Sequence, residues 1–460
     1  MEKVTPDRKQ RKRVLHLADE LVNKVTLEAE KEGIDAEVRI EGSVAKDTWL
    51  SEEPDIDIFM RVPSTLPRET LGTICLRIAR KATHGSEQVE RFAEHPYLEV
   101  TANGIRVNIV PCYRVRQGSW ISATDRTPFH TDYAKPLLNE SLRGEVRLLK
   151  RFMKGISVYG AEIKVGGFSG YLCELLILHY GSFAGVLKAM ANWQEQRIID
   201  IEGHYREREE EVRMIFEEPF VVVDPIDKGR NVAAAVRKEK LDELITASRE
   251  FLKEPSQLFF YPETTRPLDT SRLVNVLRTR GSTLVFVKLE NASTIPDILW
   301  GQLYKSQRFL RKILQQHDFR IIRDMAWSSG EDISILTFEV EQHILPLVKK
   351  HWGPPITKQA DCRKFLEKHI GASQTLSGPY IEDGRWVVET RRKQPDVVKL
   401  LTRTLRIDKK HTDLTGLYPQ ISFSDSEVLI NEEVMEFYSI NQGFAMALTE
   451  YLRGKPIWLR

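Results

Sequence analysis

Hydrophobic positions in the first part of the chain follow helical spacing and then strand spacing. The helical spacing predicts an amphipathic helix over residues 10–32, through Val14, Leu15, Ala18, Leu21, Val22 and Val25. Val38 and Ile40 alternate with polar residues and predict a strand that runs into Gly42-Ser43. Further on, the pattern predicts a strand over 55–61, a helix over 69–83, and a hairpin over 95–115 that turns at Asn103-Gly104. This order predicts a mixed α/β module that ends near residue 138.

The pattern changes twice after this module. Residues 141–255 are mostly helical in pattern, with breaks at Gly166-Gly167 and Pro219. Beyond residue 267 we expect a strand (283–290), a helix (296–316) and a strand pair, FRIIRDMAW and DISILTFEVE. This β-α-β-β order predicts a small α+β domain. The last eighty or so residues add another strand, RWVVETRR, and a basic segment.

Length, net charge and cysteine content narrow the kinds of protein that the chain can be. A length of 460 residues suffices for roughly three domains of about 150 residues. The net charge of +2 does not predict a nucleic-acid binder, although local clusters of charge still can. Four scattered cysteines without a CxxC pair disfavour a structural zinc site and favour a reducing, cytoplasmic setting. The polar start lacks a signal-peptide core, and the apolar stretch 171–190 contains Glu174, His179 and Lys188, which predicts a buried helix rather than a membrane span.

Two aspartates stand on one face of the second predicted strand. Asp55 and Asp57 are two residues apart, so they project together. Paired carboxylates repel each other unless a cation lies between them, and Mg²⁺ prefers oxygen ligands. The preceding Gly42-Ser43 turn lets the backbone approach a phosphate, to which the Ser43 hydroxyl can donate. A bare D-x-D pair is more often a solvated strand edge, so the prediction depends on the whole combination.

That combination resembles the nucleotidyltransferase signature of the polymerase β superfamily. The resemblance narrows to the archaeal-type (class I) CCA-adding enzymes through GSVAKDTWL, DIDIF, EHPY, VPCYRV, YGAEIKVGGFSGYLCELL, VVDPIDKGRNVAAAV, WGPP and GPYIEDGRWVVE. It implies an α+β multidomain fold: a polymerase β-like nucleotidyltransferase head (1–140), a helical neck that recognises the base (141–262), and a small ferredoxin-like body with a tail that bind tRNA (263–460). It also implies template-independent addition of C, C and A to the tRNA 3′ end from CTP and ATP. The enzyme is expected to be a homodimer that does not bind a membrane.

The resemblance further implies three carboxylates that hold two Mg²⁺ ions. Asp55 and Asp57 match the first two positions, and Asn108 stands at the third. An amide offers one neutral oxygen in place of a charged pair, so we expect an impaired enzyme. An inactive variant, a slowed or repurposed enzyme, and compensation by another acid stay open. A two-residue turn at 103–104 pairs Glu99 with Asn108, which makes Glu99 a candidate against the alternative of a solvated edge residue.

The resemblance also assigns nucleotide contacts. Triphosphate and sugar contacts fall on Gly42, Ser43, Lys46, Thr127, His130, Lys150 and Tyr159. Taken alone, Lys150 suggests a surface charge and Tyr159 a core aromatic; a lone histidine such as His95 is more often structural. Base choice falls on Arg230, positioned by Asp227, because an arginine offers only donors and C and A present acceptors on their pairing edges. A helix-start phosphate site or a capping role is the alternative for this segment.

Basic residues of the second half are candidates for RNA contacts. Eight basic and three acidic residues lie in 388–410, and a predicted helix holds another four basic residues. The candidates are Lys305, Arg308, Arg311, Lys312, Arg391, Arg392 and Arg403. A charge run is usually a solvated face. Two rival functions stay open: a poly(A) polymerase-like nucleotidyltransferase and a non-catalytic binder of the tRNA 3′ end.

Overall fold

The computed structural model describes residues 1–92, 94–291, 295–406 and 421–459. The chain forms two compact units, Met1–Glu263 with Lys455–Arg460, and Thr264–Gly454. Each unit contains two of the sheets described below. The three domain ranges expected from the sequence stay predictions.

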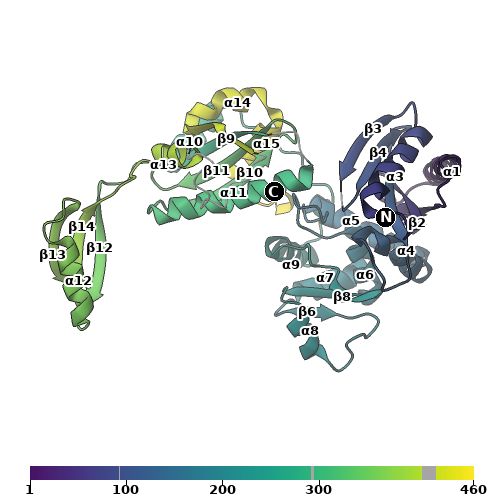
Figure 1. Ribbon diagram of the computed structural model, residues 1–460, viewed down its shortest axis with the longest axis horizontal. Coiled ribbons are helices and arrows are strands. Elements are labelled where there is room, and N and C mark those ends of the chain that lie inside the picture. Colours follow the sequence, from purple (N-terminus) through teal and green to yellow (C-terminus); the bar gives the residue numbers. More distant parts are fainter. Residues whose placement is uncertain (93, 292–294, 407–420, 460) are drawn as a thin grey trace. The chain divides into compact units, whose positions relative to one another are not determined.

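A five-stranded sheet forms the N-terminal part of the first unit. Its order is β1 (Glu37–Glu41), β2 (Asp55–Pro63), β5 (Ile105–Arg114), β4 (Pro96–Ala102) and β3 (Glu87–Phe92). The pair β2 and β5 is parallel, and the other pairs are antiparallel. Helices α1 (Arg8–Lys31) and α3 (Arg68–Ala82) pack against the sheet, α2 (Gly42–Ala45) joins β1 to the chain before β2, and α4 (Arg126–Leu137) follows β5 (Figure 1). The predicted strands, helices and hairpin of this part are confirmed, whereas β3 was not predicted.

The two faces of β2 differ in polarity. Ile56, Ile58 and Met60 have no exposed surface and join a core with residues of α1 and α3. Asp55 and Asp57 point to the opposite face, because successive side chains of a strand alternate. The β4–β5 hairpin pairs Ala102 with Ile105 across a turn at Asn103 and Gly104, both with positive φ. The sequence therefore fixes which side of this sheet is polar.

The rest of the first unit contains helices around an aromatic and aliphatic core. The helices are α5 (Glu140–Gly155), α6 (Gly170–Tyr180), α7 (Phe183–Ala191), α8 (Glu209–Ile215) and α9 (Lys238–Lys253). A small sheet of β6 (Arg197–Ile199), β7 (Phe220–Asp224) and β8 (Asp227–Asn231) lies among them. The mostly helical pattern predicted for 141–255 was therefore incomplete. Segment 227–231 is a strand, so its interpretation as a helix start is wrong.

The apolar stretch 171–190 forms two buried helices where one was predicted. Gly181 ends α6 with a left-handed backbone, and Ser182 starts α7 by accepting a hydrogen bond from the Gly185 N–H at 3.0 Å. Among the described residues, no single helix is long and apolar enough to cross a membrane; α6 and α7 reach that length and composition only as a pair bent by 90°.

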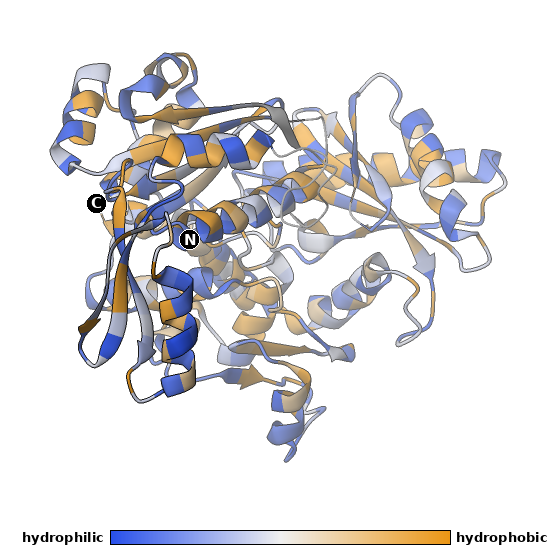
Figure 2. Cartoon of the chain, turned by 60° about the vertical axis from the view of Figure 1, so that its left-hand side comes forward, coloured by the Kyte–Doolittle hydropathy of each residue, from blue (hydrophilic) through white to orange (hydrophobic). Residues whose placement is uncertain are grey.

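The second unit is built on two sheets. The larger has the order β10 (Ile321–Ser328), β11 (Ile333–Val340), β9 (Thr283–Asn291) and β15 (Ile421–Ile430), and packs with α10 (Thr270–Arg280), α11 (Pro296–Gln316), α13 (Val397–Arg406), α14 (Met435–Ile440) and α15 (Gln442–Arg453). The smaller has the order β12 (Val348–Pro355), β14 (Arg385–Arg391) and β13 (Thr375–Glu382), with α12 (Gln359–His369). The predicted strands β9, β10, β11 and β14 and the helix α11 are confirmed. Hydrophobic and hydrophilic positions alternate along the helices, as amphipathic packing requires (Figure 2).

The end of the chain belongs to the first unit. Trp458 is almost fully buried, and its ring stacks on Phe259 with centroids 5.1 Å apart. Its indole Nε1 donates to Glu243 of α9 at 2.5 Å. Trp458 and the partly buried Ile457 thus complete a core that otherwise comes from residues before 264.

Candidate functional site

Asp55, Asp57 and Asn108 meet on the polar face of the five-stranded sheet. The parallel register of β2 and β5 pairs Asp57 with Asn108, so the three side chains share one face. Asn108 Nδ2 donates to Asp55 Oδ1 at 3.2 Å and to Asp57 Oδ1 at 3.0 Å. In the described part of the chain, no group of three or more His, Cys, Asp or Glu side chains is arranged to hold a metal ion. The site therefore offers two carboxylates and one amide.

The charges of the two aspartates are balanced unequally. Arg106 forms a two-pronged contact with Asp55, from Nε to Oδ1 at 3.1 Å and from Nη2 to Oδ2 at 2.7 Å. Burial, and next the neighbouring charge of Asp55, raise the pKa of Asp57 to about 6, while the hydrogen bond from Asn108 opposes them. Asp57 thus lacks a full counter-charge and is suited to a bound cation.

Gly42 lies directly against this pair. Its φ is +67°, and a Cβ there would stand 2.1 Å from Asp57 Oδ2, so a side chain at this position would clash with the carboxylate. The residue before it, Glu41, is fully buried, with Oε1 at 3.1 Å from Arg39 Nε. Burial raises the pKa of Glu41 to about 7. The turn between β1 and α2 therefore brings the Gly42 backbone close to Asp57, and the strand register places Glu41 opposite Asp57.

Lys46 and Lys150 share a buried carboxylate. Lys46 Nζ lies 2.6 Å and Lys150 Nζ 3.6 Å from the Glu174 side chain, which has 1% of its surface exposed. Thr48 also donates to Glu174, at 2.6 Å. Burial alone would raise the pKa of Glu174, but the two lysines leave it below its usual value; burial lowers the pKa of Lys150. The surface interpretation of Lys150 is wrong, and the cluster has one net positive charge.

Tyr159, Thr127 and Ser43 come from three segments of the first unit. Tyr159 pairs with Phe168 in a parallel bridge, and a Cβ on Gly170 would lie 3.1 Å from its hydroxyl and 3.4 Å from Lys150 Nζ. Thr127 is in the first turn of α4, and Ser43 follows Gly42 in α2. Burial raises the pKa of Tyr159, so its hydroxyl stays protonated and can donate.

His130 and Arg230 contact the same acid, Asp224. His130 Nε2 lies 2.9 Å and Arg230 Nη1 2.7 Å from Asp224 Oδ2. The His130 ring also stacks on Tyr171, with centroids 4.0 Å apart. Burial lowers the pKa of His130, although Asp224 opposes this, so the ring is neutral near pH 7.

The predicted pairing of Arg230 with Asp227 is wrong. Asp227 accepts instead from Arg126 Nε at 2.8 Å. The two carboxylates stand on opposite sides of the turn between β7 and β8, where the strand register is irregular, so sequence spacing alone could not choose between them. Arg126, Asp227 and Arg230 line a cavity of about 500 Å³, together with Ser169 and Gly229 among others.

Two further candidates have clear surroundings. The predicted register of Glu99 with Asn108 is confirmed, but the Glu99 carboxylate pairs with Arg91, at 3.1 and 2.8 Å. Compensation by Glu99 stays a prediction, and that charge is already balanced. His95 is buried and meets the Tyr113 ring edge-on at 6.3 Å, in line with a structural role.

The candidate RNA-contact residues of the second unit lie mostly on exposed surfaces. Lys305, Arg308 and Lys312 are exposed on α11, whereas Arg311 pairs with Asp324, Nε to Oδ2, at 2.9 Å. Arg403 is exposed on α13. Of the basic segment 388–410, positions 407–410 lie outside the described residues.

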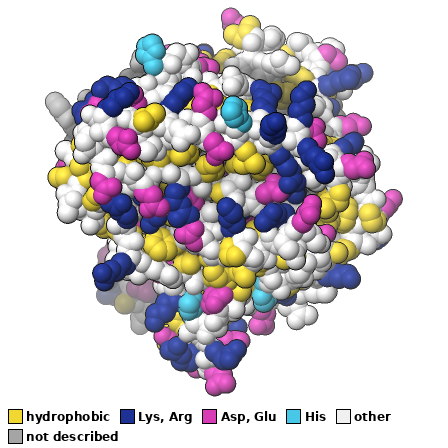
Figure 3. All heavy atoms as spheres, turned by 90° about the vertical axis from the view of Figure 1, so that its right-hand side faces the viewer, with side chains coloured by type: hydrophobic (Ala, Val, Ile, Leu, Met, Phe, Trp, Pro, Cys, Tyr) yellow, Lys and Arg dark blue, Asp and Glu magenta, His cyan; other side chains and the backbone are white. Residues whose placement is uncertain are grey.

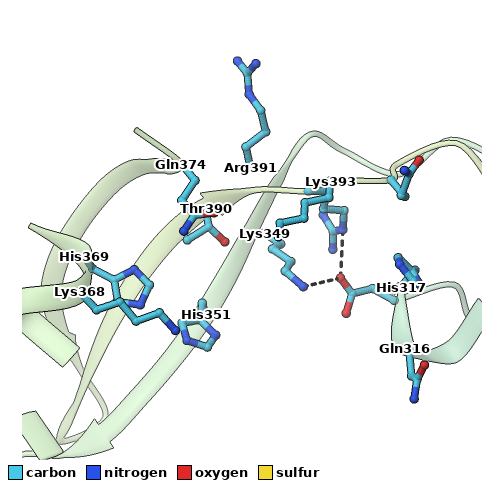
Figure 4. A pocket seen from close by; sticks show the side chains of 13 residues that line it. Gln316, His317, Lys349, His351, Lys368, His369, Gln374, Thr390, Arg391 and Lys393 are labelled. Carbon is cyan, nitrogen blue, oxygen red and sulfur yellow. Dashed lines mark hydrogen bonds and ion pairs between the residues drawn. The ribbon is translucent and has the colours of Figure 1, made fainter. Parts of the chain in front are cut away.

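Arg391 and Arg392 line a basic cavity of about 400 Å³. Asp318 is the one acid among its lining residues, and Lys349 and Arg392 pair with it at 3.2 and 3.3 Å. Arg391 points away from Lys349 and His351, as Figure 4 shows. Basic side chains dominate the lining: Lys349, Lys368, Arg391, Arg392 and Lys393. On the face shown in Figure 3, by contrast, positive and negative side chains are mixed.

Sequence reasoning missed four charged residues that hold the predicted ones: Arg106, Arg126, Glu174 and Asp224. Glu174 had a usable signal, because a lone acid within an apolar helix needs a buried cation as partner. Arg106 had one as well, since it stands two residues before Asn108 on the same face. Arg126 and Asp224 had no such signal in the sequence. Their partners Asp227 and His130 lie about a hundred positions away, and the turn between Asp224 and Arg230 has an irregular register.

Comparisons with known proteins cover nearly the whole chain. Residues 22–130 match the family "Nucleotidyltransferase domain", residues 144–261 "tRNA nucleotidyltransferase, second domain", and residues 280–413 "CCA-adding enzyme, C-terminal domain". The predicted fold class, a nucleotidyltransferase head in a multidomain α+β chain, is thereby confirmed.

Three archaeal relatives named "CCA-adding enzyme" are similar over most of their length. That of Methanosarcina barkeri is 40% identical over 404 residues, which are 87% of each chain. The relative of Methanothermobacter thermautotrophicus is 38% identical, over 86% of this chain and 85% of its own length. The relative of Methanopyrus kandleri is 34% identical, over 99% of this chain and 96% of its own length. Among solved structures, the Cid1 poly(U) polymerase covers 56% of this chain and 95% of its own, at 17% identity and a TM-score of 0.44.

Proposed function

The chain belongs to the CCA-adding enzyme family, and on this premise we propose that it adds C, C and A to the 3′ end of tRNA from CTP and ATP, without a template. The observation that supports this most directly is the close set of Asp55, Asp57 and Gly42 in a chain that matches its relatives from the nucleotidyltransferase domain onward. We place the reaction in the cytoplasm and expect a homodimer, which light scattering on the purified protein would test.

Asp55 and Asp57 are the residues that we propose to hold Mg²⁺. The raised pKa of Asp57 and the absence of a side chain at Gly42 fit a divalent cation and a phosphate at this place. Turning the Asn108 amide by half a rotation would present its oxygen in place of Nδ2. Asp55 and Asp57 would hold the metal, which would supply charge to neutralise the α-phosphate and to favour deprotonation of the attacking 3′-OH. With a neutral amide at the third position, we expect this chain to perform that chemistry slowly.

The nucleotide is proposed to lie between the sheet and α5. Ser43 and Thr127 offer hydroxyl donors, and Tyr159 a protonated phenol. Lys46 and Lys150 supply positive charge to the triphosphate, and Glu174 offsets the cost of burying the two ammonium groups. His130 already donates its Nε2–H to Asp224, and a neutral ring has no second N–H, so a contact with a phosphate oxygen requires the protonated ring with Nδ1–H as the donor.

Arg230 is proposed to select the base. Arg230 lines the cavity of about 500 Å³ and its side chain is 37% exposed, so it can reach a base there. C and A present acceptors to these donors, whereas U and G place an N–H against them. Discrimination against U and G therefore follows from hydrogen-bond chemistry alone.

The exposed basic residues are proposed to bind tRNA through its phosphates. An A-form acceptor stem hides its major groove, so recognition needs basic contacts spread along the backbone. Lys305, Arg308, Lys312 and Arg403 are exposed, and Arg391 extends from the basic cavity. Arg311 and Arg392 already pair with Asp324 and Asp318, so we expect weaker contributions from them.

Primer extension on tRNA that lacks CCA tests this function. The purified chain, with all four nucleotides and Mg²⁺, should add C, C and A and then stop, and Asp55→Asn should abolish addition. Long A tails would favour a poly(A) polymerase-like enzyme instead. The amide between the two carboxylates gives one reason to consider a non-catalytic binder of the tRNA end. Tight tRNA binding without any incorporation, in Mg²⁺ or Mn²⁺, would establish that alternative.

A further inference from the structure

We propose that Asp224 is a positioning residue that couples choice of the base to binding of the triphosphate, because it holds Arg230 and His130 on one carboxylate oxygen. The inference rests on the proposed function, which takes Arg230 as the base-selecting residue and His130 as a triphosphate contact. It adds a residue outside both groups, one that touches neither part of the nucleotide.

The contacts of Asp224 leave it little freedom. Oδ2 faces both His130 Nε2 at 2.9 Å and Arg230 Nη1 at 2.7 Å, and Oδ1 accepts from the Ile226 N–H at 3.2 Å. Asp224 has no exposed surface, so water cannot replace either partner. Charge-assisted hydrogen bonds in such a place are strong and directional. A displacement of the Arg230 guanidinium therefore changes the position that His130 prefers.

The pair is one link in a longer series of contacts. The His130 ring stacks on Tyr171 of α6, and Lys46 Nζ lies 5.4 Å from the centroid of the Tyr171 ring. One turn before His130 in α4, Arg126 pairs with Asp227 on the other side of the β7–β8 turn. Helix α4 therefore contacts the segment that carries Arg230 at two points, both through acids.

This arrangement predicts that a poorly matched base also weakens the hold on its triphosphate. A base that draws the Arg230 guanidinium away from Oδ2 leaves His130 with an unshared acceptor and a changed orientation. With Asp224 replaced by a neutral amide, both partners lose a charge-assisted bond. Each loss is expected to change binding or selection on the order of 10-fold.

Asp224→Asn is the variant that tests this coupling, and Asp200→Asn is its matched control. Asp200 is a partly buried acid of the same region that accepts from the Tyr205 N–H at 2.7 Å and has no contact with His130 or Arg230. Two quantities are measured: the ratio of kcat/KM for CTP over UTP, and inhibition by inorganic tripolyphosphate. Asp224→Asn should lower both by about 10-fold, and Asp200→Asn should change neither.

Double variants separate coupling from simple loss of structure. If Asp224 acts through its partners, its effect on the CTP:UTP ratio should largely vanish in an Arg230→Lys background, and its effect on tripolyphosphate in a His130→Asn background. Additive effects, a change in only one of the two quantities, or a lower Tm with both unchanged would overturn the proposal. Should the wild-type chain incorporate no nucleotide, equilibrium binding of CTP, UTP and tripolyphosphate to the same variants decides the coupling separately from the proposed function.

Discussion

Replacing Asn108 with aspartate would restore a third carboxylate beside Asp55 and Asp57. In the metal-free protein the change removes N–H donors that now lie 3.2 and 3.0 Å from the two acids. A hydrogen bond to a charged acceptor contributes about 1.5–3 kcal/mol, so the loss of two, discounted for the partial exposure of Asp55, should lower the free energy of unfolding by about 2–4 kcal/mol. The third acid would also repel the first two and take up a proton.

With Mg²⁺ the direction reverses. A third carboxylate adds charge and a second oxygen at the position where the 3′-OH is activated, so Asn108→Asp should raise the rate of CMP incorporation on the order of 10²-fold. The measurement is single-turnover addition of CMP to tRNA lacking CCA, across a Mg²⁺ titration, together with thermal unfolding with and without Mg²⁺. Asp55→Asn combined with Asn108→Asp keeps two carboxylates and serves as the control for charge alone.

Two linked results are expected of Asn108→Asp. Mg²⁺ should stabilise this variant more than the wild-type chain, and the same titration should accelerate it. Equal rates for the two proteins at every Mg²⁺ concentration would show that the third ligand position has no catalytic role here. A faster variant without extra stabilisation by Mg²⁺ would place the gain outside metal binding.

Three further outcomes follow from the same contacts. Burial raises the pKa of Glu41 to about 7 in the folded state, so the protonated side chain stabilises the protein below pH 4.5, and this stability is lost as the pH rises through 7. In Glu41→Gln, which cannot ionise, the free energy of unfolding should fall by up to about 3 kcal/mol less over the same pH range. Glu37→Gln, a change at a partly exposed acid of the same strand, serves as the control in chemical denaturation. Glu174→Gln leaves two buried ammonium groups without their acid and should cost about 3–5 kcal/mol of unfolding free energy, and adding Lys150→Met should recover part of it. Arg391→Gln should reduce the slope of log K against log salt for tRNA binding by about 1, and an unchanged slope would remove Arg391 from the interface.

The fold could be predicted where the spacing of hydrophobic residues clearly follows either the helical or the strand period. Helix α11 begins and ends at the predicted residues, and the polar face of β2 follows from alternation alone. Strand β3 was missed because its charged residues, EQVERF, give an edge strand little apolar pattern. Strand β7 is five fully buried residues between helices, and such a run cannot be told from a helix by its period.

In the candidate site too, local contacts could be predicted from the sequence and long-range contacts could not. The register that joins Asn108 to Glu99 could be predicted because a two-residue turn fixes the hairpin, whereas the proximity of Asn108 to Asp57 was implied only by the family resemblance, since β2 and β5 are separate in the sequence. The partners of Arg230, Lys46 and Lys150 could not, since they depend on how separate segments pack. A charged residue in an apolar segment indicates only that it needs a partner of opposite charge, because tertiary packing determines which residue that partner is.

The place of Trp458 has a bearing on how the protein is made. Its ring packs on Phe259 in the core of the first unit, although the whole second unit lies between the two residues in the sequence. During synthesis the first 263 residues leave the ribosome long before this indole does, so the aromatic core of the first unit stays incompletely covered until the second unit has also been made. Loss of Trp458 would therefore damage the portion of the protein that is synthesised earliest.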